Sequence, residues 1–173
     1  SNPFIAILVL LLTALIINFI YIQIPFPPGF DSRNYYMNIS QLIGQENGLV
    51  AGFQPYNWSL LMSYGYVIFK SPAIGHSVSF LGLLLSIWAV FDLMCNYLKM
   101  SKFDALLICT LFTITPSVMN QLFIELKVDL GLLFIQLSSI IILINAIKSQ
   151  DSKNRLHLFI LLGLISGFAL GIK

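Results

Sequence analysis

Charged residues are scarce in this chain. Asp, Glu, Lys and Arg make up 9% of its 173 residues, whereas hydrophobic residues make up 58%. Soluble globular domains carry about 25% charged residues, so the composition excludes that class. The mean hydropathy of +0.89 points the same way. We therefore expect a protein that crosses a membrane several times.

Cysteine is rare, and the positive charges do not form a single basic patch. Cys95 and Cys109 both fall inside hydrophobic stretches and lack metal-ligand spacing, so we interpret them as packing residues. The Lys and Arg residues do not form a patch that would bind nucleic acid, and the net charge is only +2. The sequence shows no repeat and no soluble domain.

Five hydrophobic stretches are candidates for membrane-spanning helices, the third of them short: 4–24, 78–98, 105–119, 130–147 and 156–172. They are judged against a hydrocarbon core of about 30 Å and a rise of about 1.5 Å per residue. The first stretch exceeds a signal-peptide core and lacks a basic segment before it, so we expect it to be retained. The sequence predicts an all-α fold, a polytopic membrane helix cluster with about five transmembrane helices.

Positive charge gathers in the two short connections that follow the second and fourth stretches: Lys99, Lys102, Lys148, Lys153 and Arg155. Because cytoplasmic loops collect Lys and Arg, we predict that both connections are cytoplasmic. The long connection 25–77 and the turn 125–129 then lie on the external or lumenal face. The protein is expected in a plasma membrane if it is bacterial.

The external connection is predicted to contain two interfacial helices. Asp31 or Ser32 can cap the first, which runs through Glu46 and carries an apolar stripe: Tyr35, Tyr36, Ile39, Leu42 and Ile43. The second, 56–70, is rich in the Tyr and Trp that favour headgroup depth. Two glycosylation sequons also fall here, at Asn38 and Asn57, although such tripeptides are common by chance.

Proline, glycine, histidine and aspartate residues give four local expectations. Pro116 should end or kink the third span. Gly163, Gly167 and Gly171 recur every four residues, which predicts a ridge for close helix packing. His76 is interpreted as an interfacial or capping residue, and Asp92 should pair locally or reach the membrane surface.

Three carboxylates fall on the predicted external side, in segments otherwise almost free of charge: Asp31, Glu125 and Asp129. On a helix, Glu125 and Asp129 would share a face while Lys127 points away. A carboxylate costs about 2.5 to 3.5 kcal/mol at the centre of a membrane helix, so these should lie near the surface or a cavity. They can form a catalytic face. Equally, Asp31 can be a helix cap, and Glu125 and Asp129 a solvated turn.

Five segments follow one another in an order and spacing that resemble a known superfamily: 30–36 (FDSRNYY), 54–58 (QPYNW), Thr115-Pro116, 128–130 (VDL) and 167–173 (GFALGIK). The chain resembles the N-terminal part of the polyprenyl-phosphate-sugar-dependent glycosyltransferases of the GT-C fold. Protein O-mannosyltransferases and lipid A aminoarabinose transferases belong to this superfamily. The resemblance covers nearly all of residues 1–173 and implies a fragment of a larger enzyme.

This resemblance implies transfer of a sugar from a polyprenyl phosphate to an acceptor hydroxyl of a glycan, lipid or protein, with inversion. Asp31 matches the acidic residue proposed as general base in the first loop, and Glu125 and Asp129 would be further catalytic residues. The residues implied in substrate binding are Arg33, Tyr35, Lys127 and Lys173. Of these, the three cations would stabilise the phosphate leaving group.

One departure from the superfamily bears on cofactors. Many relatives carry two adjacent acidic residues, or Asp with a nearby His, in the first loop. Here Ser32 follows Asp31, and Tyr36 stands where some relatives have His. No metal site is therefore assigned, although Glu125 and Asp129 could hold a divalent cation.

Two other functions are compatible with the same residues. A transporter or flippase for a lipid-linked or anionic substrate would use the carboxylates and lysines as gates or ion sites. A non-catalytic assembly subunit would use them only as helix caps. A transporter would more readily carry charge in the middle of its spans, and such charge is absent from this sequence.

The predicted orientation can be tested by labelling. Single cysteines at Gln45 and Asn120, in a background without Cys95 and Cys109, should react with an impermeant thiol reagent on intact cells or spheroplasts, because both positions are predicted to be external. Reaction only after permeabilisation would reverse the orientation and remove the predicted catalytic face.

Overall fold

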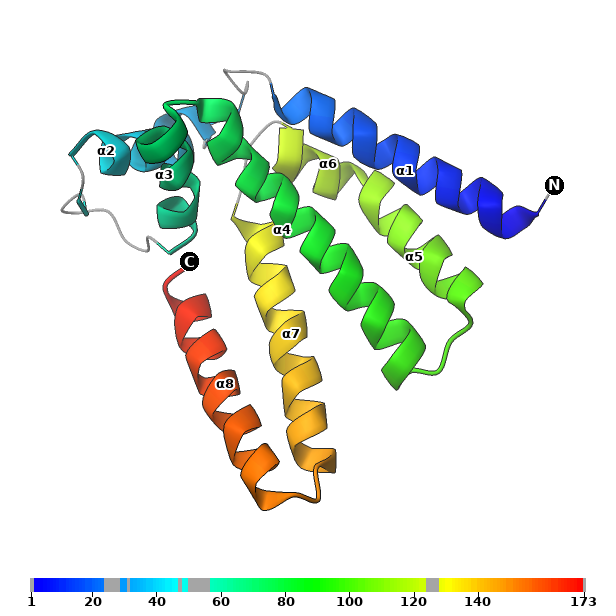
Figure 1. Ribbon diagram of the computed structural model, residues 1–173. Helices are drawn as coiled ribbons and strands as arrows, with labels where there is room; N and C mark the ends of the chain where they lie inside the picture. The colour runs from blue at the N-terminus through cyan, green and yellow to red at the C-terminus, as the bar shows by residue number, and fades with distance from the viewer. Residues whose placement is uncertain are drawn as a thin grey trace.

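The computed structural model describes residues 2–23, 29–30, 32–46, 48–49, 57–123 and 128–172. Every element in these ranges is a helix (Figure 1). The elements in chain order are α1 Pro3–Ile22, η1 Ser32–Tyr36, α2 Met37–Glu46, α3 Asn57–Phe69, α4 Pro72–Asp92, η2 Leu93–Tyr97, α5 Lys102–Ile114, α6 Pro116–Phe123, α7 Asp129–Lys148 and α8 Ser152–Leu170. Here η1 and η2 are single π-helical segments.

The predicted all-α membrane helix cluster is confirmed. In the described part of the chain, four helices are long and apolar enough to cross a membrane: α1, α4 with η2, α7 and α8. The bent pair α5–α6 makes a fifth if it is counted as one span. The second span begins at Pro72 instead of residue 78, because Pro72 fits the first helical turn, where no amide donor is needed.

Proline also divides the third span as predicted. Helix α5 ends at Ile114, α6 begins at Pro116, and the two axes are bent by 57°. Pro116 lacks an amide hydrogen, and its ring restricts Thr115 to an extended backbone, here with ψ at 130°.

Two lysines end helices in the left-handed backbone conformation that glycine usually adopts there. Lys70 has φ of 52° and Lys99 has φ of 58°. In each case the following amide reaches back over the last turn: Ser71 N donates to Gly65 O at 3.1 Å, and Met100 N donates to Met94 O at 3.0 Å. This is the usual hydrogen-bond pattern of a helix C-terminus, formed without glycine.

The predicted interfacial helices are present as η1 with α2, and as α3. Ile39 and Ile43 of the predicted apolar stripe are buried. Helix α2 crosses α3 closely at Gly44, where an added Cβ would lie 2.9 Å from Tyr66 Cβ. The two helices form one compact unit at one end of the membrane helices (Figure 1).

The core of the helix cluster lies where this unit meets the spans. One group of buried side chains draws on α1, α4, α6 and α7: Ile22, Leu83, Val118, Leu122 and Leu130. Toward their other ends the helices spread apart (Figure 1). There α4 and α7 stay linked, because Tyr97 Oη donates to Asn145 Oδ1 at 2.9 Å.

The indole of Trp58 packs between two helices at glycine positions. An added Cβ on Gly82 of α4 would lie 3.0 Å from the Trp58 ring, and one on Gly131 of α7 would overlap three ring atoms. The same two glycines bring α4 and α7 together, since the Gly82 Cβ would lie 3.1 Å from Gly131 N. Only glycine leaves room for the ring on both sides.

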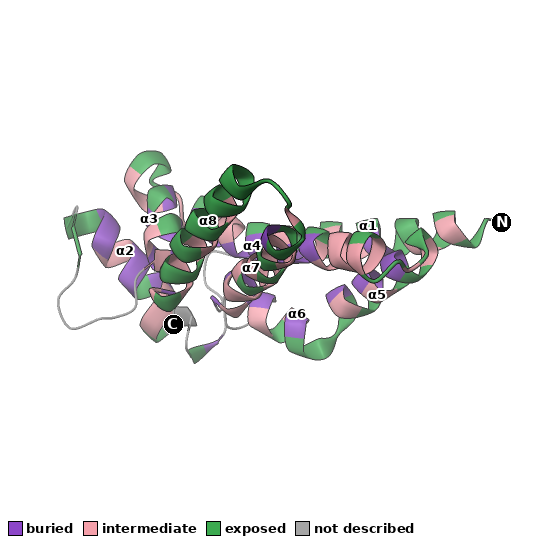
Figure 2. Ribbon diagram, turned by 90° about the horizontal axis from the view of Figure 1, so that it is seen from below, coloured by how far each residue is buried: buried purple, intermediate pink, exposed green. Residues whose placement is uncertain are grey.

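The predicted glycine ridge on α8 is only partly correct. A Cβ on Gly163 or Gly167 would meet nothing within 4 Å, and no residue of α8 is buried. Figure 2 shows this helix largely exposed along its length. Gly171 alone is closely packed, against the side chain of Asn57. The physical reason is that α8 packs along α7 on another face, so the ridge is turned away from its neighbour.

These two glycine environments predict opposite effects of the same substitution. Gly131→Ala should lower the free energy of unfolding by about 1–3 kcal/mol, because the new methyl group overlaps the Trp58 ring. The matched control Gly163→Ala should be neutral or stabilising by up to about 1 kcal/mol, because alanine is the better helix former. Thermal unfolding in detergent measures both, and equal stability of the two variants would contradict the packing of Trp58.

Candidate functional site

The structure describes two of the predicted site residues in full, Tyr35 and Asp129. The others lie outside the described residues, or have side chains that do: Asp31, Arg33, Glu125, Lys127 and Lys173. Their predicted roles therefore remain predictions. What the structure does place are the residues next to them in the sequence.

Tyr35 lies within the continuous helical segment formed by η1 and α2, whereas Asp129 lies at the start of a helix. Tyr35 belongs to η1, and its ring meets that of Tyr36 edge-on, with centroids 5.2 Å apart. Asp129 is the first residue of α7 and is half-buried. A carboxylate is favourable in the first turn of a helix because it faces the positive end of the helix dipole. Asp129 therefore lies at the end of a candidate span and not at its centre.

A buried group, which we name the Trp58 cluster, joins the segments that carry the predicted site residues. It consists of Trp58, Met62, Val128 and Ile172, each no more than 4% exposed. Tyr36 and Phe168 are among the side chains that pack against it.

Sequence neighbours of the predicted residues are thus brought together. Tyr36 follows Tyr35, Val128 lies between Lys127 and Asp129, and Ile172 precedes Lys173. The described parts of four of the five segments that carry the superfamily resemblance, 30–36, 54–58, 128–130 and 167–173, therefore meet in one cluster. The sequence alone suggested only that these segments lie on one side of the membrane.

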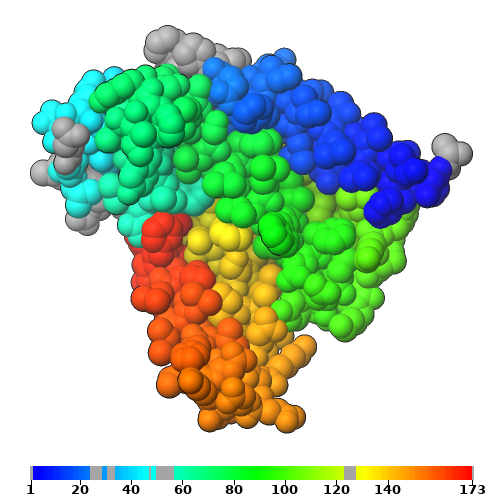
Figure 3. All heavy atoms as spheres, in the orientation of Figure 1, coloured from blue at the N-terminus to red at the C-terminus, as the bar shows by residue number. Residues whose placement is uncertain are grey.

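Asn57 fastens the end of α8 to the start of α3. Its backbone N donates to Gly171 O at 2.8 Å, and its side-chain Nδ2 donates to Phe168 O at 2.8 Å. Carbonyls in the last turn of a helix lack partners within that helix, so Asn57 caps α8 from a segment more than a hundred residues away. Figure 3 shows the C-terminal end of the chain against α3.

The helical packing also bears on the two sequons. Asn57 uses its side-chain nitrogen in the α8 cap, and Ser59 is buried. Ser40 of the other sequon is buried and donates to Tyr36 O at 2.8 Å. Neither tripeptide is accessible as a whole in the folded chain.

His76 differs from its expected role. It is fully buried and lies within α4, whose N-cap position is taken by Ser71. The interpretation of His76 as a capping residue is wrong, because α4 starts earlier than predicted and His76 falls in its second turn. Beside it, Gln23 Nε2 donates to Ser77 Oγ at 3.3 Å and links the end of α1 to α4.

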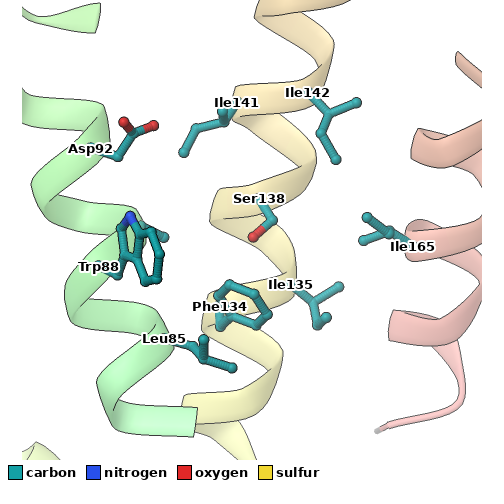
Figure 4. A pocket seen from close by; sticks show the side chains of 10 residues that line it. Leu85, Trp88, Asp92, Phe134, Ile135, Ser138, Ile141, Ile142 and Ile165 are labelled. Carbon is teal, nitrogen blue, oxygen red and sulfur yellow. The ribbon is translucent and has the colours of Figure 1, made fainter. Parts of the chain in front are cut away.

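An apolar groove leads away from the Trp58 cluster. It has a volume of about 430 Å³ and lies among α4, α7 and α8 (Figure 4). Ile135 belongs both to its lining and to the side chains that pack on the Trp58 cluster. Asp92 is the one charged residue among the described lining residues, and its Oδ1 accepts a hydrogen bond from Asn96, as expected for local pairing.

Sequence reasoning missed a polar hollow between α2 and α3, lined by Gln41, Gln45, Tyr66 and Lys70 together with Gly44. Its signal in the sequence was the spacing of amides off the apolar stripe of α2. Burial raises the pKa of Tyr66 to about 12, so its hydroxyl stays protonated at physiological pH. That hydroxyl is buried and has no hydrogen-bond partner among the described residues.

Comparisons with known proteins add no family. No family model, curated protein or solved structure matches the chain. Among the described residues, no three His, Cys, Asp or Glu side chains come together in a group that could hold a metal ion. Glu125, one of the two predicted carboxylates for a divalent cation, lies outside those residues.

The cap from Asn57 predicts a local effect. Asn57→Ala should speed amide hydrogen exchange in the last turn of α8 by about two- to tenfold, because Phe168 O loses the hydrogen bond from Asn57 Nδ2, worth about 0.5–1.5 kcal/mol, and keeps the one from Gly171 N at 3.1 Å. The control is Asn34→Ala, which removes a similar bond to the nearby Phe30 O and should leave α8 unchanged. Unchanged exchange in both variants would show that α8 does not depend on Asn57.

Proposed function

We propose that this protein is a membrane glycosyltransferase that moves a sugar from a polyprenyl-phosphate donor to an acceptor hydroxyl on the external or lumenal face, with inversion. The observation that supports this most is the Trp58 cluster. It gathers described parts of segments 30–36, 54–58, 128–130 and 167–173, the segments that carry the resemblance to GT-C glycosyltransferases.

The proposed chemistry uses the residues that border this cluster in the sequence. Asp31 takes the proton of the acceptor hydroxyl while the acceptor oxygen attacks the anomeric carbon from the face opposite the phosphate. The bond from sugar to phosphate breaks, and its electron pair leaves with the phosphate. Lys173, Arg33 and Lys127 supply positive charge to that leaving group. Glu125 and Asp129 orient the acceptor or hold a divalent cation.

The apolar groove gives the donor's hydrocarbon chain a place. Its described lining is almost entirely hydrophobic. The groove runs from Ile135 of α7 toward Asp92 of α4 (Figure 4). A polyprenyl chain in this groove would be anchored close to the Trp58 cluster. Its phosphate would then lie near the start of α7 and the end of α8. These are the places next to which the proposed cations Lys127 and Lys173 occur in the sequence.

The transporter or flippase alternative has less support. Proteins of that kind place ionisable groups at the bilayer midplane. In the described spans, Asp, Glu, Lys and Arg occur near the ends: Asp129 and Lys148 are the first and last residues of α7, and Asp92 precedes η2 at the end of its span. An assembly subunit remains an alternative that the following experiment distinguishes.

The general-base role predicts a separation of turnover from binding. In membranes that contain the protein and a polyprenyl-phosphate sugar, Asp31→Asn should lower kcat by about 100-fold or more, because the amide cannot accept a proton. Its donor Kd should stay unchanged. The control is Glu46→Gln, which neutralises an exposed carboxylate at the end of α2 and should keep full turnover.

The same assay tests the phosphate contact. Lys173→Ala should raise the donor Kd by about tenfold, the loss expected for one charge-assisted hydrogen bond. Wild-type turnover in Asp31→Asn would eliminate the base assignment, and an unchanged donor Kd in Lys173→Ala would eliminate the phosphate contact. If neither variant differs from wild type, a non-catalytic assembly role is favoured.

A further inference from the structure

The polar hollow between α2 and α3 has a defined geometric origin. The two helices cross at Gly44, which touches the base of Tyr66. Gln41 and Gln45 are four residues apart and flank that crossing on α2, while Tyr66 lies on α3 and Lys70 directly follows its last residue, Phe69. Gln41 and Gln45 share one face of α2 because of this spacing, and they line the hollow together with Tyr66 and Lys70.

The hollow continues along α2. Its first part, between the helices, has a volume of about 280 Å³. A second part of about 260 Å³ shares Gln41 and Gln45 with the first and extends to Asn38 and Leu42. The two hollows adjoin because they share Gln41 and Gln45 as walls, and we treat them together as one trough. It has room for a small polar group with several substituents.

The polar groups of the trough are unused within the described part of the chain. Asn38, Gln41, Gln45 and Lys70 form no hydrogen bond or ion pair there, apart from their helical backbone bonds. Each amide can both donate and accept, whereas the Lys70 ammonium can only donate. Tyr66 also lines the hollow, and its hydroxyl is buried without a hydrogen-bond partner in the described part of the chain.

This set of groups defines a chemical class of ligand. A hydroxyl both donates and accepts, and a side-chain amide matches both functions. A phosphate oxygen accepts from an ammonium. One cation with three amides therefore matches one phosphate and several hydroxyls better than it matches a bare anion. The carboxylate of Glu46 ends α2 but is not among the lining residues, so it does not oppose the phosphate inside the trough.

We propose that this trough binds a phosphate ester with free hydroxyl groups, such as a phosphoglycerol or phosphosugar group. Lys70 holds the phosphate, and Gln41, Gln45 and Asn38 hold the hydroxyls. The same chemistry is found on a lipid headgroup at the membrane surface and on a soluble ester. The inference does not depend on sugar transfer, because no residue of the trough has a part in the proposed reaction.

Binding is measured in two arms with the purified protein in detergent. In the soluble arm, glycerol 1-phosphate and inorganic phosphate are each titrated into the protein, and the rise in its unfolding temperature is compared. In the lipid arm, the protein is incubated with vesicles that contain equal amounts of phosphatidylglycerol and phosphatidic acid. It is then purified again, and the lipid that it retains is identified by mass spectrometry. Stabilisation by glycerol 1-phosphate identifies a soluble ester, whereas selective retention of phosphatidylglycerol alone identifies a lipid headgroup.

The variants separate the phosphate from the hydroxyl contacts. Lys70→Asn removes the cation while keeping a residue that tolerates the left-handed backbone, and it should weaken binding by about tenfold. Lys99→Asn is the matched control, because Lys99 has the same backbone conformation at a distant helix end and should leave binding unchanged. Gln41→Met keeps length and helix propensity but removes the amide, and it should weaken binding about fivefold.

The outcome is decided by selectivity. Preference for the hydroxylated ester or lipid, lost in Lys70→Asn and kept in Lys99→Asn, supports the proposal. Equal binding of inorganic phosphate and glycerol 1-phosphate, together with equal retention of both lipids, would overturn the hydroxyl contacts. Equal effects of Lys70→Asn and Lys99→Asn, or no binding in either arm, would overturn the trough as a site. Transfer activity should be unaffected throughout, so failure here leaves the proposed function untouched.

Discussion

The packing of one indole ring is the constraint on which the arrangement of this chain depends. Trp58 fits only because Gly82 and Gly131 lack side chains, and it carries the start of α3 with it. Its neighbour Asn57 then binds the end of α8 through two hydrogen bonds. Two adjacent residues thus join α3 and α4 to α7 and α8, a later pair of helices in the chain. In a membrane, where apolar surface gives little drive for helix association, such close fits and interhelical hydrogen bonds matter more than area.

The fold could be predicted from the sequence largely because lipid imposes simple rules. Long apolar runs identify spans, and Pro116 identifies a bend without knowledge of any neighbour. The glycines could not be interpreted in this way. Gly131 and Gly163 are both helical glycines in spans, yet one receives an indole and the other faces open space. The spacing of glycines shows that a ridge of small residues exists. Only the packing of the other helices decides whether that ridge contacts a neighbour.

The candidate site was predictable to a different extent. The carboxylates and cations were visible because charge is rare here, and the order of motifs suggested roles for them. The cap formed by Asn57 was not predictable, because it needs a partner more than a hundred residues away. The amides of α2 were recognised only as residues off an apolar stripe, which is also how a solvated face looks. It is the crossing at Gly44, set by tertiary packing, that places Gln41 and Gln45 in one hollow with Lys70.

The left-handed lysines connect backbone geometry to ionic strength. A residue with a Cβ in this conformation costs about 1–2 kcal/mol that glycine avoids, so Lys70 and Lys99 hold their helix ends under strain. A cation at a helix C-terminus offsets part of that cost by facing the negative end of the dipole. Salt screens the attraction but not the steric cost. Rising salt concentration should therefore loosen the ends of α3 and η2.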